Sequence, residues 1–276
     1  RAIGRLVAKL EKLGELDNTI IIYSSDNGSY LRDRNGELRG SKGSLFEGGH
    51  RVPGIFYWKG KIPGGLVEDE PAGAVDLLPS ICGLIGIAPP GVHLDGSDLA
   101  PLLTRTRPFE RHQPLFWMSD STMVLRMGDY TLSAPGTTKL PFDHAKANLL
   151  MQQTKMALGD DLENELGELD LRSRMFNGKF ANPEANRLQK QFRDMFYFNE
   201  AWIPLMKKGG IERVQLYDLA SDLSQERDIA AKQPELVAQM KKKANAIYQS
   251  VMADAPDWGQ KPLETTPSNS SSPGLS

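Results

Sequence analysis

The chain has 276 residues, of which 39% are hydrophobic and 25% charged, and its formal net charge is -2. This length and composition are typical of a globular protein of one or two domains, and they exclude a collagenous, disordered or membrane-spanning chain, while the balanced charge gives no basis for nucleic-acid binding. One cysteine and four histidines exclude an intramolecular disulfide and the usual closed structural zinc site.

The first part of the chain is predicted to alternate helices and strands. Residues 1–13 place apolar side chains on one stripe at helical spacing, so the chain is expected to open inside a helix. Such a start suggests that an upstream portion is missing, and a mature terminus produced by processing is the alternative. Residues 19–25 form a β-branched run, typical of a strand buried on both faces of a parallel sheet. A second strand is predicted within 51–58, and Asp76 is expected to cap the helix that follows it. We therefore predict an α/β fold over residues 1–107, with a mixed, mostly parallel sheet flanked by helices.

Residues 108–260 are predicted to form a small α+β subdomain. It begins with an antiparallel hairpin that turns at Gly128-Asp129, and a strand is expected at 214–219. Between them, a polar and helix-favouring segment at about 144–210 is predicted to be a helical insertion. The tail, 261–276, is rich in Ser, Pro and Thr without apolar periodicity, which predicts disorder.

The last helix of this subdomain is expected to follow Pro234, a residue that suits the first turn of a helix. Its buried stripe is predicted to consist of Leu236, Val237, Met240, Ile247 and Val251.

Asp26, Asn27 and Gly28 come directly after the first predicted strand. In open parallel sheets ligands bind just beyond the carboxyl ends of strands, and a carboxylate beside a carboxamide offers the hard oxygen donors that Ca²⁺ or Mg²⁺ prefers. Asp-Asn-Gly is also a common turn sequence, so the residues alone leave a plain turn as an alternative.

A glycine-dense loop with several cations follows at residues 39–53. Backbone amides of such loops approach a tetrahedral oxyanion closely, and Lys42, His50 and Arg51 can offset its charge. The loop lacks the ending of a nucleotide P-loop. A flexible loop with solvated charges is the alternative for this segment.

Together these segments resemble the sulfatase family, of the arylsulfatase type within the alkaline-phosphatase-like superfamily. The motifs, in chain order, are Ser25-Asp26-Asn27-Gly28, Gly40-Ser41-Lys42-Gly43, Glu47-Gly48-Gly49-His50-Arg51-Val52-Pro53, Val75-Asp76-Leu77-Leu78-Pro79-Ser80, Leu94-Asp95-Gly96-Ser97-Asp98-Leu99-Ala100-Pro101-Leu102-Leu103 and Leu216-Tyr217-Asp218-Leu219. The resemblance covers most of the chain and is thin between about 144 and 210.

The resemblance implies a role for individual residues. Asp26 and Asn27 match the family's later pair of metal ligands, usually for Ca²⁺, and Lys42 matches the lysine that contacts the sulfate group in catalysis. His50 lies where some relatives contact substrate. Glu47 and Arg51 are expected to pair locally and to hold the loop.

The resemblance also shows what this chain lacks. The family's nucleophile is a formylglycine made from Cys or Ser in a Cys/Ser-x-Pro/Ala-x-Arg string, which is absent here, and Cys82 on an apolar helix is expected to be a core thiol. The first pair of aspartate ligands and the upstream acid-base residues also have no counterpart. We therefore expect the carboxy-terminal portion of a sulfatase, inactive alone, that acts on a sulfated small molecule or carbohydrate and is periplasmic, secreted or lysosomal. The alternatives are a non-catalytic sulfatase-like module and a phosphoesterase of the same superfamily.

Overall fold

A computed structural model describes residues 2–119, 122–134, 140–196 and 202–255, and the predicted tail at 261–276 lies outside them. The chain divides into two compact units. The first unit comprises residues 1–137 and 210–250, and the second, which we call the helical unit, comprises 138–209 and 251–276. The sequence predicts a domain boundary between residues 107 and 108, and the first unit contains residues from both sides of it. That domain boundary stays a prediction.

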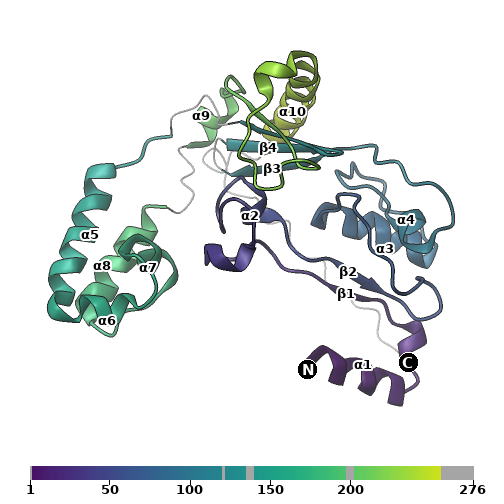
Figure 1. Cartoon of the computed structure of the whole chain (residues 1–276), viewed down its shortest axis with the longest axis horizontal. Coiled ribbons are helices and arrows are strands. Elements are labelled where there is room, and N and C mark those ends of the chain that lie inside the picture. Colours follow the sequence, from purple (N-terminus) through teal and green to yellow (C-terminus); the bar gives the residue numbers. More distant parts are fainter. Residues whose placement is uncertain (1, 120–121, 135–139, 197–201, 256–276) are drawn as a thin grey trace, which may run out of the picture. The chain divides into compact units, whose positions relative to one another are not determined.

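The first unit opens with the predicted helix and a two-stranded sheet (Figure 1). Its elements up to residue 107 are α1 (Ala2–Lys12), β1 (Ile21–Tyr23), α2 (Glu47–His50), β2 (Ile55–Tyr57), α3 (Leu77–Ile85) and α4 (Ala100–Thr104). Strand β1 pairs with β2 in antiparallel register, with Ile22 opposite Phe56. Pro53, which cannot donate to a ladder, lies outside β2.

The expectation of a parallel strand buried on both faces is wrong for β1. Ile21 and Ile22 are half-buried and Tyr23 is exposed, and every strand pairing among the described residues is antiparallel. An apolar run predicts burial only if other elements cover both faces, and β2 is the only strand paired with β1 in the described part of the chain.

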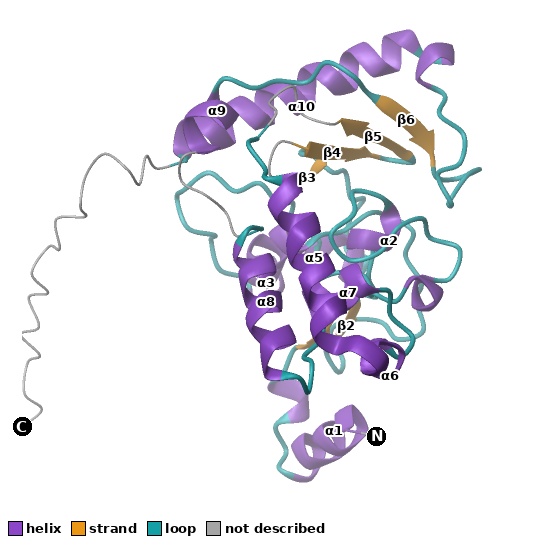
Figure 2. Cartoon of the chain, turned by 90° about the vertical axis from the view of Figure 1, so that its left-hand side faces the viewer, coloured by secondary structure: helices purple, strands orange, loops and turns teal. Residues whose placement is uncertain are grey.

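The second sheet of this unit contains four antiparallel strands in the order β3-β4-β5-β6. They are β3 (Leu115–Ser119), β4 (Thr122–Met127), β5 (Tyr130–Ala134) and β6 (Gln215–Asp218). The predicted hairpin at Gly128-Asp129 is confirmed, since Met127 pairs with Tyr130 across that turn. On one face of the sheet, Leu125, Leu132 and Leu216 are aligned and fully buried. In Figures 1 and 2, α10 (Pro234–Asp254) runs along one side of this sheet and α2 lies on the other.

The buried stripe of α10 differs from the prediction. Met240 is buried as expected, but Ala244 and Tyr248 are also buried, whereas Val251 is exposed. The stripe therefore follows residues four apart, and it includes a small side chain and a tyrosine that a search for large aliphatic residues passes over.

A buried ion pair links the start of α3 to the loop before β3. Asp76 is completely buried, and its two carboxylate oxygens lie 3.0 and 2.7 Å from the two terminal nitrogens of Arg111. Asp76 also accepts hydrogen bonds from the backbone amides of Gly73 and Ser97, each at 2.7 Å. The expected side-chain cap of α3 is wrong, because the carboxylate is used for these contacts instead.

The helical unit is built around an apolar core of its own. Its helices are α5 (His144–Leu158), α6 (Leu162–Leu166), α7 (Leu171–Asn177), α8 (Pro183–Asp194) and α9 (Ile203–Lys207). Asp143 caps α5 and Asn182 caps α8 by accepting hydrogen bonds from backbone amides of the first helical turn. The core is formed by Ala147, Leu150, Leu158, Met175, Phe180, Ala185, Leu188 and Phe192. The helix-favouring composition of this segment is thus matched by helices in the structure.

No helix within the described residues is both long and apolar enough to cross a membrane.

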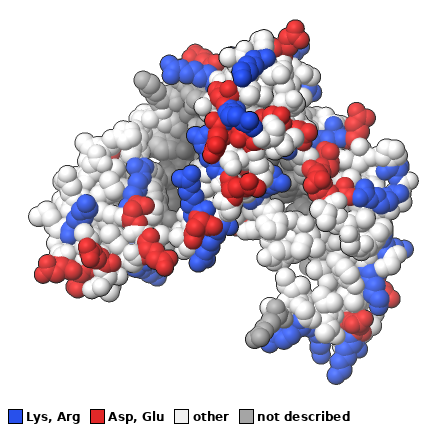
Figure 3. Space-filling model, in the orientation of Figure 1, with Lys and Arg blue, Asp and Glu red and all other residues white. Residues whose placement is uncertain are grey.

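Two apolar surfaces of the first unit are exposed. Ile3, Leu6 and Leu13 of the α1 region are each about half exposed (48%, 53% and 58%), and Ile55 on β2 is 56% exposed. On the face drawn in Figure 3, the area over β1 and β2 carries few charged side chains. Apolar surface of this kind favours association between chains.

We therefore expect the purified chain to self-associate as its concentration rises. A variant with Leu6→Lys and Ile55→Lys should stay monomeric to a higher concentration, because each lysine places a charge on the apolar surface. Sedimentation velocity measures the effect. Met156→Lys is the control, since Met156 lies in the helical unit and is 81% exposed. Equal association by all three proteins would contradict this prediction.

Candidate functional site

Backbone hydrogen bonds bring the two predicted functional segments together. The amide of Gly28 donates to the carbonyl of Gly49 at 3.0 Å, and the amide of Lys42 donates to the carbonyl of Ser29 at 3.0 Å. The side chain of Asn35 adds a further link, because it bonds to the amide and the carbonyl of Ser29 and also donates to the carbonyl of Gly40 at 3.2 Å. The segment after β1 therefore lies against the loop that contains Lys42 and His50.

Glycines make this close approach feasible. A Cβ atom at position 28 would overlap the carbonyl oxygen of Gly48, and one at position 48 would lie 2.5 Å from the carbonyl oxygen of Gly40 and 2.6 Å from that of Arg39. The obstructing atoms are all backbone atoms, so they cannot move aside as a flexible side chain would. Gly28 and Gly48 are thus required for the close packing of these segments.

The side chains of Asp26 and Asn27 lie beside each other at the end of β1. Asn27 donates from its amide nitrogen to Asp26 Oδ2 at 2.7 Å, and the hydroxyl of Ser25 lies 3.3 Å from Asp26 Oδ1. The pKa of Asp26 is lowered, chiefly by a hydrogen bond from its own backbone amide, with smaller contributions from Ser25, Asn27 and the positive charge of Lys42. Asp26 and Lys42 are both exposed. An ionised carboxylate, an amide and a cation thus share one exposed region.

These donors fit a Ca²⁺ site in kind but not in number. Ca²⁺ takes six to eight oxygen ligands, whereas Asp26 and Asn27 provide one carboxylate and one carboxamide. Within the described residues, no group of three or more His, Cys, Asp or Glu side chains is placed to hold a metal ion. Asp26 and Asn27 can therefore supply only part of a Ca²⁺ coordination shell.

Glu47 is a buried carboxylate at the centre of a cluster of cations. Its Oε1 atom lies 3.3 Å from His50 Nε2 and 3.8 Å from Arg126 Nη1, and its Oε2 atom lies 3.4 Å from Arg51 Nη1. The local pairing of Glu47 with Arg51 expected from the sequence is confirmed. Burial acts to raise the pKa of Glu47, but the hydrogen bond from His50 and the charges of His50, Arg126 and Arg51 outweigh it, so the pKa is lowered overall.

This lowered pKa predicts a pH-dependent contribution to stability. The ionised carboxylate stabilises the fold fully above its ordinary pKa of about 4.3, and this stabilisation is lost as the pH falls through the lower pKa of the folded state. We expect Glu47→Gln to reduce the free energy of unfolding at pH 7 and to reduce it progressively less as the solution is acidified. Urea titrations over a pH series measure the difference. A difference between the two proteins that stays constant down to pH 3 would contradict the role of charge.

The loop is also tied to the segment after β6, through Gln225, a residue that the motifs did not single out. Arg39 donates to the backbone carbonyl of Gln225 at 2.7 Å and lies over the ring of Phe46 at 3.8 Å. The amide of Glu47 donates to Gln225 Oε1 at 2.8 Å. Gln225 is fully buried, and its side-chain nitrogen has no partner within the described residues.

The environments of the single cysteine, the other three histidines and the four tryptophans are as follows. Cys82 is buried, as expected for a core thiol, and His93, His112 and His144 are exposed. Trp58 donates to a backbone carbonyl, Trp202 is buried, Trp117 stacks on His50 as described below, and Trp258 lies outside the described residues.

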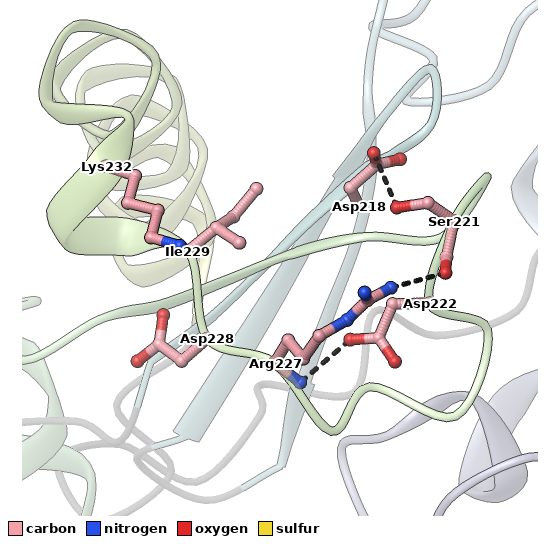
Figure 4. A pocket seen from close by; sticks show the side chains of 7 residues that line it. All are labelled: Asp218, Ser221, Asp222, Arg227, Asp228, Ile229 and Lys232. Carbon is pink, nitrogen blue, oxygen red and sulfur yellow. Dashed lines mark hydrogen bonds between the residues drawn. The ribbon is translucent and has the colours of Figure 1, made fainter.

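A cavity elsewhere in the first unit does not resemble a ligand site. It has a volume of about 450 Å³ and is lined by Asp218, Ser221, Asp222, Arg227, Asp228, Ile229 and Lys232 (Figure 4). Its three carboxylates accept hydrogen bonds from neighbouring backbone amides, for example Asp222 from Arg227 and Asp228 from Leu216. The aspartates therefore stabilise turns after β6.

Sequence comparisons relate this chain to sulfatases. Residues 1–87 match the family model described as Sulfatase. Human arylsulfatase A is 33% identical over 184 residues, which cover 60% of this chain and 36% of that protein. Canis lupus familiaris N-acetylgalactosamine-6-sulfatase is 33% identical over 137 residues, covering 47% of this chain and 26% of that protein. The resemblance expected from the motifs is confirmed, and the chain spans roughly a quarter to a third of the length of these relatives.

Solved structures show that the fold is shared. A protein solved with its substrate D-glucosamine-2-N,6-O-disulfate matches with a TM-score of 0.51 and 17% identity, over 94% of this chain and 40% of that one. A Bacteroides thetaiotaomicron protein, solved in work on glycosaminoglycan metabolism, matches with a TM-score of 0.53 and 19% identity, over 89% and 42% of the two chains. The expected α/β fold is thus shared with these solved structures, apart from the parallel pairing expected for its strands.

Proposed function

Because the sulfatase family model matches residues 1–87, we propose that this chain is the carboxy-terminal portion of a sulfatase, an enzyme that hydrolyses sulfate esters. The observation that carries the proposal is the Gly28–Gly49 hydrogen bond, together with that from Lys42 to Ser29, since these bonds hold the segment of Asp26 and Asn27 against the Lys42 loop. In this proposal Asp26 and Asn27 are Ca²⁺ ligands, and Lys42 and His50 contact the substrate.

The chemistry of sulfate ester cleavage suits these residue types. Hydrolysis places negative charge on the nonbridging oxygens of the sulfate group and on the departing oxygen, and a lysine ammonium at Lys42 stabilises that charge. Bound Ca²⁺ would supply further positive charge next to the sulfate group. The chain holds no Cys/Ser-x-Pro/Ala-x-Arg string, so we propose that it supplies part of the site and is inactive by itself.

The proposed substrate is a sulfated small molecule or carbohydrate. Support comes from relatives named arylsulfatase A and N-acetylgalactosamine-6-sulfatase, and from the neighbour solved with a sulfated glucosamine. A periplasmic, secreted or lysosomal location is proposed from the family alone.

A two-step titration of the isotopically labelled chain tests the proposed site. We expect Ca²⁺ to shift the NMR signals of Asn27 and Gly28 with a dissociation constant of about 1 mM or weaker, because few ligands are present. Sulfate added afterwards should shift the amide of Lys42. Asp26→Asn should weaken the Ca²⁺ response at least tenfold, and Lys42→Ala should remove the sulfate response alone, because each variant deletes one charge from the site.

The matched controls are Asp33→Asn and Lys61→Ala, which remove exposed charges of the same kinds from the same unit. These controls should bind as the unmodified chain does. The proposed roles of Asp26 and Lys42 would be wrong if the site variants and the controls responded alike, or if sodium chloride at equal ionic strength reproduced the sulfate shifts.

A non-catalytic sulfatase-like module is the second candidate. The observation that favours it is that the chain retains the loop and its hydrogen bonds but lacks the nucleophile string. A phosphoesterase of the same superfamily is less well supported, because the relatives named above are sulfatases.

A further inference from the structure

His50 is held between a buried carboxylate and an aromatic ring. Its Nε2 atom lies 3.3 Å from Glu47 Oε1, and its ring lies 4.4 Å from the ring of Trp117 at an interplanar angle of 35°. The side chain of His50 is 13% exposed. We propose that Glu47 is a positioning residue, which fixes the ring of His50 against Trp117 at the edge of the candidate sulfate site; the functional meaning of this placement rests on the proposed function.

The register of the four-stranded sheet explains why these groups meet. Arg126 pairs with Leu115 on β3 and with Thr131 on β5, and Thr131 pairs with Tyr217 on β6, so these residues share one face. Trp117 follows Leu115 by two residues and lies on the same face. That face presents Trp117, Arg126 and Tyr217 to the loop at 39–51, whereas the opposite face presents leucines.

Glu47 connects this face to the loop. Arg126 Nη1 lies 3.8 Å from the same Glu47 oxygen that faces His50, and the side chains of Glu47 and Arg126 are only 6% and 10% exposed. The backbone of Glu47 is held separately, because its amide donates to Gln225. Arg126 thus holds the carboxylate of Glu47 and Gln225 holds its backbone, and both contacts position the carboxylate that faces the imidazole.

The contact also determines which nitrogen of His50 carries a hydrogen. An ionised carboxylate only accepts hydrogen bonds, so Nε2 must be the donor to Glu47. Nε2 donates whether the ring is neutral or charged, and Nδ1 is an acceptor in the neutral ring only. His50 follows Gly49, which accepts the amide of Gly28, so the backbone of His50 adjoins the segment that contains Asp26 and Asn27.

NMR of the histidine side chains in the full chain tests the proposal without added Ca²⁺ or sulfate. The four histidines give a simple spectrum, and His50→Asn identifies the signals of His50. We expect a hydrogen-bonded Nε2 proton that exchanges slowly with water, and ring protons shifted upfield by the ring current of Trp117. Trp117→Leu should remove the upfield shift, and Glu47→Ala should remove the slowly exchanging proton and reduce the upfield shift.

Glu47→Gln separates positioning from a general loss of structure. A glutamine oxygen can still accept from Nε2, so this variant should restore the slowly exchanging proton, although the attraction to Arg126 is lost. Unchanged His50 signals in a folded Glu47→Ala variant, with intact amide signals from β4 and β5, would overturn the proposal. If Glu47→Ala does not fold, the spectrum of the unmodified chain still tests the proposal. Absence of both the slowly exchanging proton and the upfield shift in that spectrum would overturn the proposal.

The placement of His50 and the proposed function can each be contradicted without the other. Normal His50 signals together with no response to Ca²⁺ and sulfate would contradict the proposed function and leave the placement of His50 intact. A Ca²⁺ and sulfate response together with unaffected His50 signals in Glu47→Ala would do the reverse.

Discussion

Replacing Asp76 with alanine is expected to destabilise the first unit by about 3–5 kcal/mol, the usual cost of removing one partner from a buried ion pair. The cost is high because Arg111, whose side chain is 9% exposed, would lose its close partner and keep only the more distant Glu70, whose Oε1 lies 4.0 Å from Arg111 Nε. The amides of Gly73 and Ser97 would also lose their acceptor. Since typical domains are stable by only about 5–15 kcal/mol, this single change should leave little residual stability.

Urea unfolding should be followed through amide signals of β4 and β5, because a chain of two units need not unfold in one step. Asp95→Ala is the matched control, since Asp95 pairs with His93 and its side chain is 71% exposed. This control should change stability by less than about 0.5 kcal/mol. The double variant Asp76→Ala, Arg111→Met should recover part of the loss, because the unpaired charge is gone. Equal effects of Asp76→Ala and Asp95→Ala would contradict a structural role for the ion pair.

Replacing Gly28 with alanine is the second change expected to have a large effect. The new methyl group would overlap the carbonyl oxygen of Gly48 and lie 3.3 Å from the carbonyl carbon of Gly49. The segment after β1 must then move away from the loop, which breaks the hydrogen bond between Gly28 and Gly49. We expect a destabilisation of about 1–3 kcal/mol, typical of overpacking, and loss of the Ca²⁺ and sulfate responses even though Asp26 and Lys42 are unchanged.

Gly54→Ala is the control for this variant. Gly54 lies in the nearby loop, and an added Cβ there would meet nothing within 4 Å. It should keep both the stability and the ligand responses of the unmodified chain. If Gly28→Ala also kept them, the close approach of the two segments would not be needed for the site.

Local patterns predicted the local elements of this fold. Helical spacing of apolar residues located α1, and the Gly128-Asp129 turn between two apolar runs located the β4–β5 hairpin. The orientation of β1 was not predictable, because its partner β2 lies beyond a long loop and the apolar run does not encode which neighbour pairs with it. The cap expected at Asp76 was wrong because the distant Arg111 and Ser97 compete for its carboxylate.

In the candidate site, too, contacts between near neighbours in sequence were predictable and contacts between distant residues were not. Glu47 and Arg51 are four residues apart, so their pairing could be predicted from helical geometry. The link between Glu47 and Gln225 spans 178 residues, and no local signal marks Gln225 as a partner of the loop. Arg126 is similar, because it reads as one residue of a hairpin strand until the register shows which face it shares with Trp117.

Determining the coding sequence upstream of Arg1 most directly tests the claim that this chain is the carboxy-terminal portion of a sulfatase. We predict a continuous reading frame that encodes a Cys/Ser-x-Pro/Ala-x-Arg string and a pair of aspartates, which would complete the site proposed for Asp26, Asn27 and Lys42. An in-frame stop codon directly upstream, or an upstream segment without that string, would contradict the claim and favour the non-catalytic module.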